Sequence, residues 1–394
     1  MGGAVPGGAA VTDFDAILLA SFGGPEGQDD VIPFLRNVTR GRGIPDERLE
    51  EVATHYRHFG GVSPINAQNR ALKAALETEL ARRGIDLPVY WGNRNWAPYF
   101  ADTVRAAHAA GDDRLLAVVT SAYTSYSGVG QYREDFEQAL ADVEVSGDAR
   151  GVTIDRVREY FDHPGFVTPF IEGVRAALER LSAPPSTAPP SSAPPSTAPP
   201  SSASPSSADA VARDSLHLLF VTHSIPTTAA DASGAESAAT EFGPGGAYVA
   251  QHRAVAEVIA REAAPGLPYS LVYQSRSGSP QTPWLEPDIN DAIDELAAGG
   301  QVRAVIIVPF GFVSDHMEVL WDLDNEAKAT ATRHGILAER VPTPGTHPAF
   351  VAGLVDLILE RLNDVPDADR ARLTPLGPWP DQASVGAREE SRAR

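Results

Sequence analysis

Residues 302–326 read VRAVIIVPFGFVSDHMEVLWDLDNE, and the fold prediction starts from this stretch. The apolar run over 302–308 predicts a buried strand, and the amphipathic segment over 315–331 predicts a helix. A strand that leads directly into a helix is the repeating unit of α/β proteins. The helical segment also carries one histidine and five carboxylates within residues 315–326.

Three of these carboxylates, Glu318, Asp322 and Glu326, recur at every fourth position, and we call them the acidic column. Side chains at this spacing lie on one face of a helix, where like charges repel. Their presence in register therefore favours a positive partner, and a metal ion is the first candidate. The alternative, which this stretch alone leaves open, is a solvated acidic face on an acidic protein.

The alternation of strand and helix extends along the chain in both directions. Short all-apolar strands between amphipathic helices predict parallel sheets that are covered on both faces. We therefore expect an α/β fold with two similar lobes, each a parallel sheet of about four strands flanked by helices, around a central cleft. The expected strands are 16–20, 89–91, 115–120, 152–157, 216–222, 269–274 and 302–308. The expected helices include 26–38, 46–59, 67–83, 99–110, 166–181, 248–263, 288–298 and 348–362.

The composition also predicts where the lobes begin and end. Residues 182–210 contain a five-residue repeat of Pro, Ser, Ala and Thr, which cannot bury a core and predicts a disordered insertion. The Gly/Ala-rich residues 1–12 and the polar, Pro-rich residues 365–394 are also expected to be disordered. The first lobe then comprises 13–160 plus 345–364, and the second comprises 161–344.

Charge and composition exclude several classes of function. A net charge of −20 over 394 residues disfavours binding to nucleic acid and to anionic membranes. The chain has no cysteine, so disulfides, thiolate zinc sites, cysteine nucleophiles and thiolate-held iron–sulfur clusters are excluded. It shows no signal peptide and no apolar run of membrane-spanning length, which favours the cytoplasm. Dinucleotide, nucleotide-triphosphate and serine-hydrolase motifs are also missing from the sequence.

His223 is the main catalytic candidate because it directly follows the predicted strand at 216–222. Ligands of open α/β sheets bind at the carboxyl ends of strands, and Phe22 and Tyr123 follow other predicted strands in the same way. The alternative is a histidine that only caps the next segment. Elsewhere, Arg40, Arg42, Tyr56 and Ser63 belong to a stretch whose guanidinium and hydroxyl groups suit carboxylate recognition. Surface salt bridges are the alternative for these arginines.

Taken together, several segments of the chain resemble the ferrochelatase family over residues 15–362. The resemblance implies two Rossmann-like lobes with a deep cleft, and a last helix that returns to the first lobe. It also implies a lyase of haem biosynthesis, a metal chelatase that inserts Fe²⁺ into a porphyrin. The segments that carry it are FGGVSPI (59–65), TSAYTSYSGVGQYRE (120–134), THSIP (222–226), YQSRSG (273–278), PWL (283–285) and GFVSDHMEVLWDLDNEA (311–327).

The resemblance also assigns roles to residues. His223 matches the active-site histidine and would act as the base and as a metal contact, with Glu318 facing it across the cleft. Asp322 and Glu326 match a path for the metal ion or for protons. The remaining residues would bind the porphyrin, as ring walls or as partners of its propionates, and they are Phe22, Arg40, Arg42, Tyr56, Ser63, Tyr123, Tyr126 and Trp284.

The expected substrate is coproporphyrin III, as in the family members of Gram-positive actinobacteria, and protoporphyrin IX is the alternative. A cobalt or nickel chelatase of the same fold and a non-catalytic tetrapyrrole or iron carrier also remain open. Two positions depart from the family pattern. Phe22 stands where many relatives carry a tyrosine that can touch the metal, and Val129 stands where some relatives have a cysteine that holds a [2Fe–2S] cluster.

The expected partners are therefore the porphyrin and Fe²⁺, which is a substrate, together with transient contacts to neighbouring haem-pathway enzymes. We expect no tightly bound cofactor, no iron–sulfur cluster, no nucleic acid and no integral membrane association. The default oligomeric state is a monomer.

Overall fold

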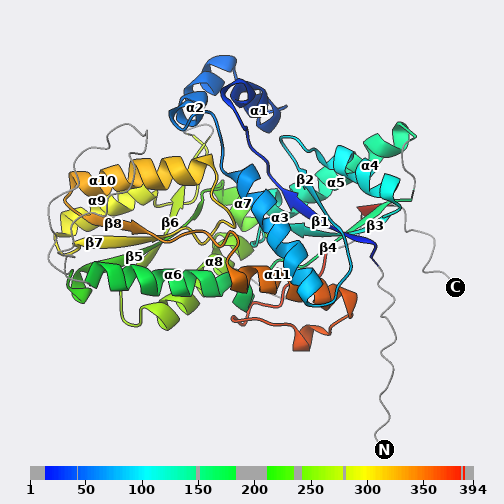
Figure 1. Ribbon diagram of the computed structural model, residues 1–394. Helices are drawn as coiled ribbons and strands as arrows, with labels where there is room; N and C mark the ends of the chain where they lie inside the picture. Colours follow the sequence, from blue (N-terminus) through cyan, green and yellow to red (C-terminus); the bar gives the residue numbers. More distant parts are fainter. Residues whose placement is uncertain are drawn as a thin grey trace, which may run out of the picture.

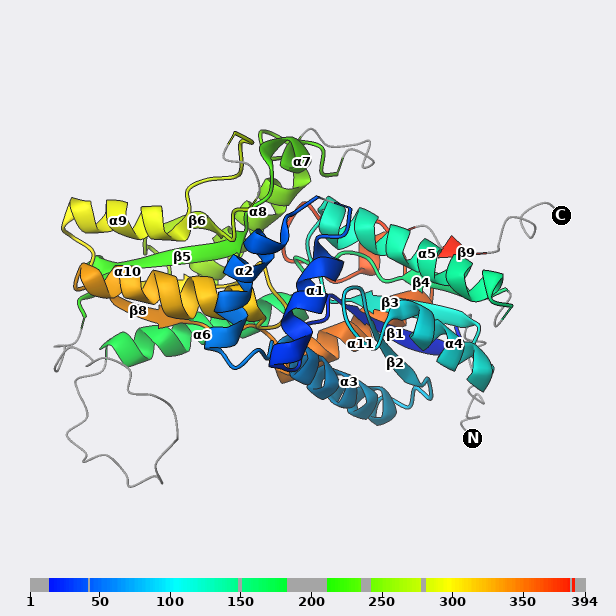
Figure 2. The same ribbon diagram turned by 90° about the horizontal axis from the view of Figure 1, so that it is seen from above.

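The computed structural model describes residues 14–41, 43–147, 151–182, 211–234, 242–277, 281–382 and 385–386. The expectations for residues 1–12, for nearly all of the insertion and for Arg42 lie outside these residues. The described chain forms two sheets flanked by helices, which confirms the predicted α/β fold (Figure 1). In both views the two sheets lie side by side along the long axis of the molecule (Figure 2).

The first sheet has the strand order β2-β1-β3-β4-β9. Strands β1 to β4 are parallel, and β9 pairs with β4 in the antiparallel direction. β1 is buried at every position, as expected for a central strand that is covered on both faces. The strands are β1 (Ala16–Ser21), β2 (Val89–Asn93), β3 (Arg114–Val119), β4 (Thr153–Arg156) and β9 (Val385–Gly386). Helices α3 (Ile65–Arg82), α4 (Phe100–Ala110), α5 (Gln131–Val145) and α11 (Pro348–Leu362) contact this sheet.

The second sheet has the order β6-β5-β7-β8 and is parallel throughout. Its central strand β7 is entirely apolar and buried, and β5 is mostly apolar and buried up to Thr222, which is why the sequence pattern identified them. The strands are β5 (Leu216–His223), β6 (Tyr269–Gln274), β7 (Ala304–Val308) and β8 (Leu337–Arg340). Helices α6 (Pro164–Ser182), α8 (Gly246–Ala263), α9 (Ile289–Gly299) and α10 (Lys328–Arg333) contact this sheet, and the short α7 (Thr227–Asp231) follows β5.

One hydrophobic core joins the two sheets. Ile17 of β1 and Phe220 of β5 belong to the same cluster of buried residues, which also includes side chains from α3, α6, α8 and α11. Helices α6 and α11 approach each other closely at Gly165 and Gly353. A Cβ added to Gly165 would lie only 2.7 Å from the Cα of Gly353, so this contact requires a glycine. α11 also packs on α3 of the first lobe. The last helix therefore contacts α6 on the second sheet and α3 on the first sheet.

Two short helices, α1 (Val31–Val38) and α2 (Asp46–His58), stand outside both sheets (Figure 1). They pack on each other through a small core of their own that includes Phe34, Leu49 and Tyr56. A small core of this kind leaves α1 and α2 dependent on contacts with the rest of the chain.

The expectation of a disordered tail over 365–394 is wrong for residues 365–382. Trp379 is 5% exposed and packs on Phe161. Arg370 pairs with Asp381 at 2.7 Å, and the Thr374 hydroxyl donates to the carboxylate of Asp162 at 2.8 Å. The segment lacks helical or strand periodicity, so the sequence pattern could not show that these few side chains anchor it.

The predicted helix at 315–331 also differs from the structure. It is a π-helix over Val319–Ala327 that continues into α10 at Lys328–Arg333. A π turn is closed by an i→i+5 hydrogen bond and holds more residues than an α turn. Positions four apart remain close to one face in both geometries, so the spacing of the acidic column could not distinguish them.

His163 titrates in a way that links the fold to pH. It precedes α6, and its Nδ1 accepts a hydrogen bond from the backbone N–H of Gly165 at 3.1 Å. Burial, together with the positive charge of Arg158, lowers the pKa of His163 to about 4. The pKa of His163 is lower in the folded protein than in the unfolded chain. The contribution of neutral His163 to the free energy of unfolding is therefore complete above about pH 6.5 and is lost as the pH falls toward 4.

We predict that His163→Asn removes this pH dependence. Asparagine keeps an acceptor at the helix start but cannot be protonated. Between pH 7 and pH 4 the wild type should lose up to about 3 kcal/mol more unfolding free energy than the variant. Urea unfolding at both pH values measures this difference, with His334→Asn as the control at a more exposed histidine. Parallel losses in the wild type and His163→Asn would contradict the prediction.

Candidate active site

His223 lies at the carboxyl end of β5, next to Gln274 at the end of β6. The segment that follows β7 is brought against this end of β5 at Gly311. A Cβ at Gly311 would lie 2.2 Å from the Thr222 hydroxyl, so a glycine is needed for this close approach. Tyr248 of α8 donates a hydrogen bond to the backbone carbonyl of His223 and fixes the strand end. The parallel sheet therefore places His223 beside the helix that carries the acidic column.

Glu318 faces His223 as the sequence comparison implied. The Nε2 of His223 lies 3.5 Å from the Oε2 of Glu318, and the Nδ1 of His316 lies 4.0 Å from the same oxygen. The other ring nitrogen of His223 meets the carbonyl of Ser224, so it must donate there. In the neutral ring the free lone pair is then on Nε2, which is the atom that faces Glu318.

The charges of the pair favour an imidazolium and a carboxylate. Burial lowers the pKa of His223, but the hydrogen bond and the charge of Glu318 outweigh it and raise this pKa overall. Burial raises the pKa of Glu318, but His223 outweighs that effect and brings it to about 2. The two side chains are 36% and 50% exposed, so the pair is open to solvent and to a ligand.

Asp322 is the second member of the acidic column. It accepts hydrogen bonds from Ser275 and from Gln274, the latter at 3.2 Å. Burial raises its pKa to about 7, and the negative charges of Glu318 and Glu326 act in the same direction although the bond from Ser275 opposes them. Glu326, the third member, accepts a hydrogen bond from the indole of Trp321 at 2.9 Å.

The structure divides the five carboxylates of this segment into two groups. Asp315 and Asp324 form ion pairs with Arg340, and Asp324 also pairs with Lys328. The acidic column has no lysine or arginine partner among the described residues, because its members meet only a histidine or neutral donors. Without a lysine or arginine from these residues beside it, the column can attract a cation or accept protons.

Helices α1 and α2 contact the segment that carries Glu318 through Met317 and Trp321. Met317, between His316 and Glu318, is 1% exposed and belongs to the small core of α1 and α2. Trp321 stacks on His55 of α2 with ring centroids 4.0 Å apart. These contacts hold the residues that flank Glu318 against the first lobe.

Some predicted ring-binding residues have exposed surface. Phe22 is 37% exposed, with Phe34 of α1 at 6.3 Å and the guanidinium of Arg94 at 6.0 Å from its ring. Tyr126 is 59% exposed and donates to Glu134. Trp284 is half-buried beside the segment that follows His223, and Arg40 is exposed and bonded to Asn37.

Others among the predicted porphyrin-binding residues are buried. Tyr123 is 3% exposed and stacks on His252 of α8 at 3.6 Å, so its ring belongs to the shared core. Tyr56 is 9% exposed within the core of α1 and α2, and Ser63 is 3% exposed. The sequence showed that Tyr123 follows a strand but could not show to which side its ring turns.

Sequence reasoning gave no role to Ser275, Trp321 or Arg340, which contact the carboxylates of this segment. Position after a strand could have indicated Ser275, which follows β6 directly. No local pattern indicates Arg340, because it reaches the segment only through the pairing of β7 with β8.

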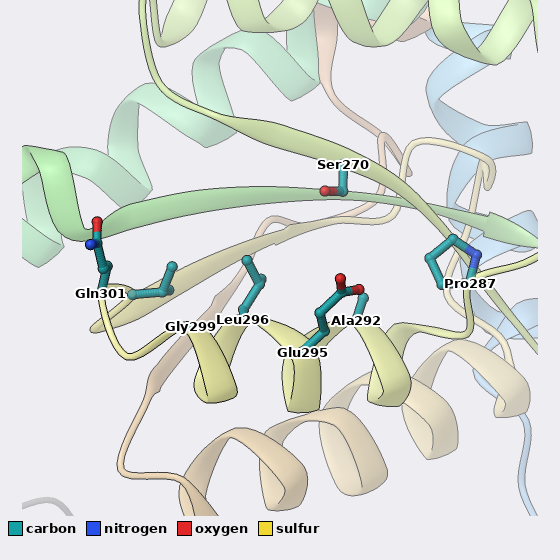
Figure 3. Close-up of a pocket in the computed structure, with 8 residues that line it drawn as sticks. Ser270, Pro287, Ala292, Glu295, Leu296, Gly299 and Gln301 are labelled. Atoms are coloured by element: carbon teal, nitrogen blue, oxygen red, sulfur yellow. The ribbon is translucent and has the colours of Figure 1, made fainter.

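No three His, Asp or Glu side chains within the described ranges are grouped closely enough to hold a metal ion as they stand. A cavity of about 460 Å³ lies away from His223, beside α9 and the start of β6 (Figure 3). It is lined by Ser270, Pro287, Ala292, Glu295, Leu296, Gly299, Gln301 and Val302. The candidate active site is therefore the His223–Glu318 pair with the acidic column, and not this cavity.

Comparison with known proteins shows the family of the chain. The ferrochelatase family model matches residues 14–362. The chain belongs to the ferrochelatase family. Coproporphyrin III ferrochelatase from Leifsonia xyli is 57% identical, over 99% of this chain and 96% of that protein. The proteins of the same name from Tropheryma whipplei (strain Twist) and Streptomyces coelicolor are 51% and 52% identical, over 97% and 89% of this chain and 90% and 86% of theirs.

The ferrochelatase match extends from two residues before β1 to the end of α11 and so includes strands β1 to β8 of the two sheets. Residues 365–382, which pack on the first lobe, lie beyond it. Among the residues that the structure describes, no helix combines the length and the apolar character needed to cross a bilayer.

We predict that Asp322→Asn stabilises the fold at neutral pH. The folded pKa of about 7 lies above the ordinary value of a carboxyl group, so the contribution of Asp322 is favourable below about pH 4 and is lost as the pH rises to 7. Asparagine removes the buried charge and can still accept from Ser275. Its unfolding free energy at pH 8 should exceed that of the wild type by about 1–3 kcal/mol.

Chemical unfolding at pH 8 and at pH 4 measures this gain, which should nearly vanish at pH 4. Glu326→Gln is the matched control, because Glu326 is an exposed member of the same acidic column. Its effect should stay within about 0.5 kcal/mol. A destabilised Asp322→Asn at pH 8 would show that the carboxylate is favourable where it lies.

Proposed function

We propose that this protein inserts Fe²⁺ into coproporphyrin III and releases coproheme III in haem biosynthesis. The observation that carries the proposal is the His223–Glu318 pair in a chain of the ferrochelatase family. The acidic column beside this pair has no lysine or arginine partner within the part of the chain that the structure describes. The substrate follows from the relatives in Leifsonia, Tropheryma and Streptomyces, whose names give coproporphyrin III.

The chemistry requires a base near the centre of the porphyrin ring. Insertion of Fe²⁺ forms bonds to the pyrrole nitrogens and releases two N–H protons, so the overall reaction needs neither an oxidant nor a reductant. In our proposal the resting imidazolium of His223 first releases its Nε2 proton toward the acidic column, and the freed Nε2 then accepts a pyrrole proton. The bond from its Nδ1 to Ser224 holds the ring in place throughout. Glu318 stabilises the imidazolium that results.

The acidic column supports the passage of a cation or of protons to and from this centre. Carboxylate oxygens are hard ligands, and they bind a divalent ion without the strong retention that thiolates would give. With a pKa of about 7, Asp322 can both accept and donate a proton near neutral pH. Fe²⁺ is a substrate in this scheme, and the proposed enzyme needs no bound cofactor and no iron–sulfur cluster.

The surroundings of the enzyme are part of the proposal. We place it in the cytoplasm as a monomer that meets its porphyrin, Fe²⁺ and neighbouring haem-pathway enzymes only transiently. The porphyrin would lie against Phe22, Tyr126 and Trp284, the predicted wall residues that are not fully buried. Arg40 is an exposed candidate for a propionate contact.

We predict that the protein metalates coproporphyrin III under anaerobic conditions. Absorbance spectra with Fe²⁺ and either coproporphyrin III or protoporphyrin IX measure the reaction. Coproporphyrin III should give the faster appearance of the metalloporphyrin bands. No metalation of either porphyrin would overturn the proposal, and faster turnover of protoporphyrin IX would overturn the choice of substrate.

We also predict that His223→Ala and Glu318→Gln each lower kcat by about a hundredfold or more, because both act at the proton-transfer step. The control is His334→Ala, at a histidine that pairs with Asp294 on α9. Its kcat should equal that of the wild type. Porphyrin binding without any loss of turnover in His223→Ala would instead favour a carrier or a different base.

A further inference from the structure

Arg340 is the last residue of β8, and its guanidinium reaches two carboxylates of the active-site segment. Its Nη1 and Nη2 donate to the two oxygens of Asp315 at 3.0 and 3.2 Å. Its Nε and Nη2 lie 3.0 and 2.8 Å from the two oxygens of Asp324. The Arg340 side chain is only 12% exposed. Such a double fork is a geometry that only a planar guanidinium can supply.

The two carboxylates lie at opposite ends of the functional part of this segment. Asp315 immediately precedes His316, and Asp324 lies between Asp322 and Glu326 within the π-helix. Arg340 therefore links Asp315, which precedes the π-helix, to Asp324 in the second half of that helix. The residues between these two points include Glu318 and Asp322.

Other contacts extend the same network. The Thr343 hydroxyl donates to Asp315 at 3.0 Å, and the backbone N–H of Asp315 donates to the side chain of Gln68 on α3 at 2.9 Å. Lys328 pairs with Asp324 at 2.6 Å. The entry of the helix is thus joined to β8 of its own lobe and also to the first lobe.

A π-helix needs such external support. It is rare and occurs mostly as single turns at functional sites, whereas this one spans Val319–Ala327. Its ion pairs with Arg340 at 2.8 Å and with Lys328 at 2.6 Å connect Asp324 of this helix to β8 and to α10.

We propose that Arg340 is a positioning residue for metal insertion, which holds Asp315 and Asp324 behind the π-helix and so keeps Glu318 and Asp322 turned toward His223. This inference rests on the proposed function of the site. Arg340 touches neither substrate. It acts through the backbone of the segment, in the way that outer partners orient the ligands of a metal.

Steady-state kinetics with Fe²⁺ and coproporphyrin III provide the first test, on Arg340→Lys and Arg340→Gln. Lysine keeps the charge but not the double fork, so we expect both variants to lower kcat/KM for Fe²⁺ by about 10–100-fold, with glutamine the more severe. The KM for coproporphyrin III should change by less than about twofold, since the ring-binding surface is untouched. Equal effects on both substrates, or none, would overturn the inference.

The matched control is Glu339→Gln on the same strand. Glu339 pairs with Arg180 of α6 at 2.7 Å, next to Arg340 but outside its network. Removal of this ion pair perturbs β8 without disturbing Asp315 or Asp324. The control should retain the wild-type kcat/KM for Fe²⁺, and a loss as large as that of Arg340→Gln would show that any change on β8 has this effect.

A triple variant, Asp315→Asn with Asp324→Asn and Arg340→Gln, separates positioning from stability. Loss of Arg340 alone leaves two poorly compensated carboxylates, which destabilises the fold. Neutral amides remove that cost, so the Tm should return toward the wild-type value. The kcat/KM for Fe²⁺ should stay low, because the fork is still missing. Recovery of both quantities would show a purely structural role.

Hydrogen exchange without any substrate tests the holding of the helix independently of turnover. Amides of residues 319–327 should exchange faster in Arg340→Gln than in the wild type, while those of α9 should not change. Unchanged exchange at 319–327 would overturn the inference even in an active enzyme. A wild type that metalates no porphyrin would overturn the proposed function instead, and the exchange comparison would still decide whether Arg340 holds the segment.

Discussion

The ion pair between His223 and Glu318 is the interaction on which the rest of the site depends. His223 is the last residue of β5, and Glu318 lies in the segment that follows β7. Strands β5 and β7 are adjacent and parallel. A parallel sheet brings the carboxyl ends of its strands to one edge. Each member also fixes the charge of the other, since Glu318 raises the pKa of His223 and His223 lowers that of Glu318.

The remaining carboxylates of this segment differ in their partners, because some form ion pairs with basic side chains and others do not. Arg340 and Lys328 neutralise Asp315 and Asp324, whereas Asp322 receives only the neutral donors Ser275 and Gln274. A carboxylate in the position of Asp322 costs stability, as its raised pKa shows. Local instability of this kind is common where a charge serves function and not folding.

Sequence reasoning succeeded where a physical signal was local. The apolar strands at 16–20, 115–120, 216–222 and 302–308 could be predicted because central parallel strands are buried on both faces. Strand β8 (Leu337–Arg340) was missed because it is an edge strand whose side chains are all half-buried. The pair of His223 and Glu318 could be anticipated from strand ends and family resemblance, but the burial of Tyr123 could not, since side-chain direction depends on the packing of α8.

In the proposed reaction the pairing of His223 with Glu318 favours a site that handles iron in passing. The two side chains satisfy each other's charges. In that scheme an arriving ion competes with their pairing, which lowers its net affinity and favours its release to the porphyrin. That balance requires Glu318 to be held firmly, since a loose side chain would pay an ordering cost at each turnover. Met317 packed into α1 and α2 on one side and Arg340 on the other supply that restraint.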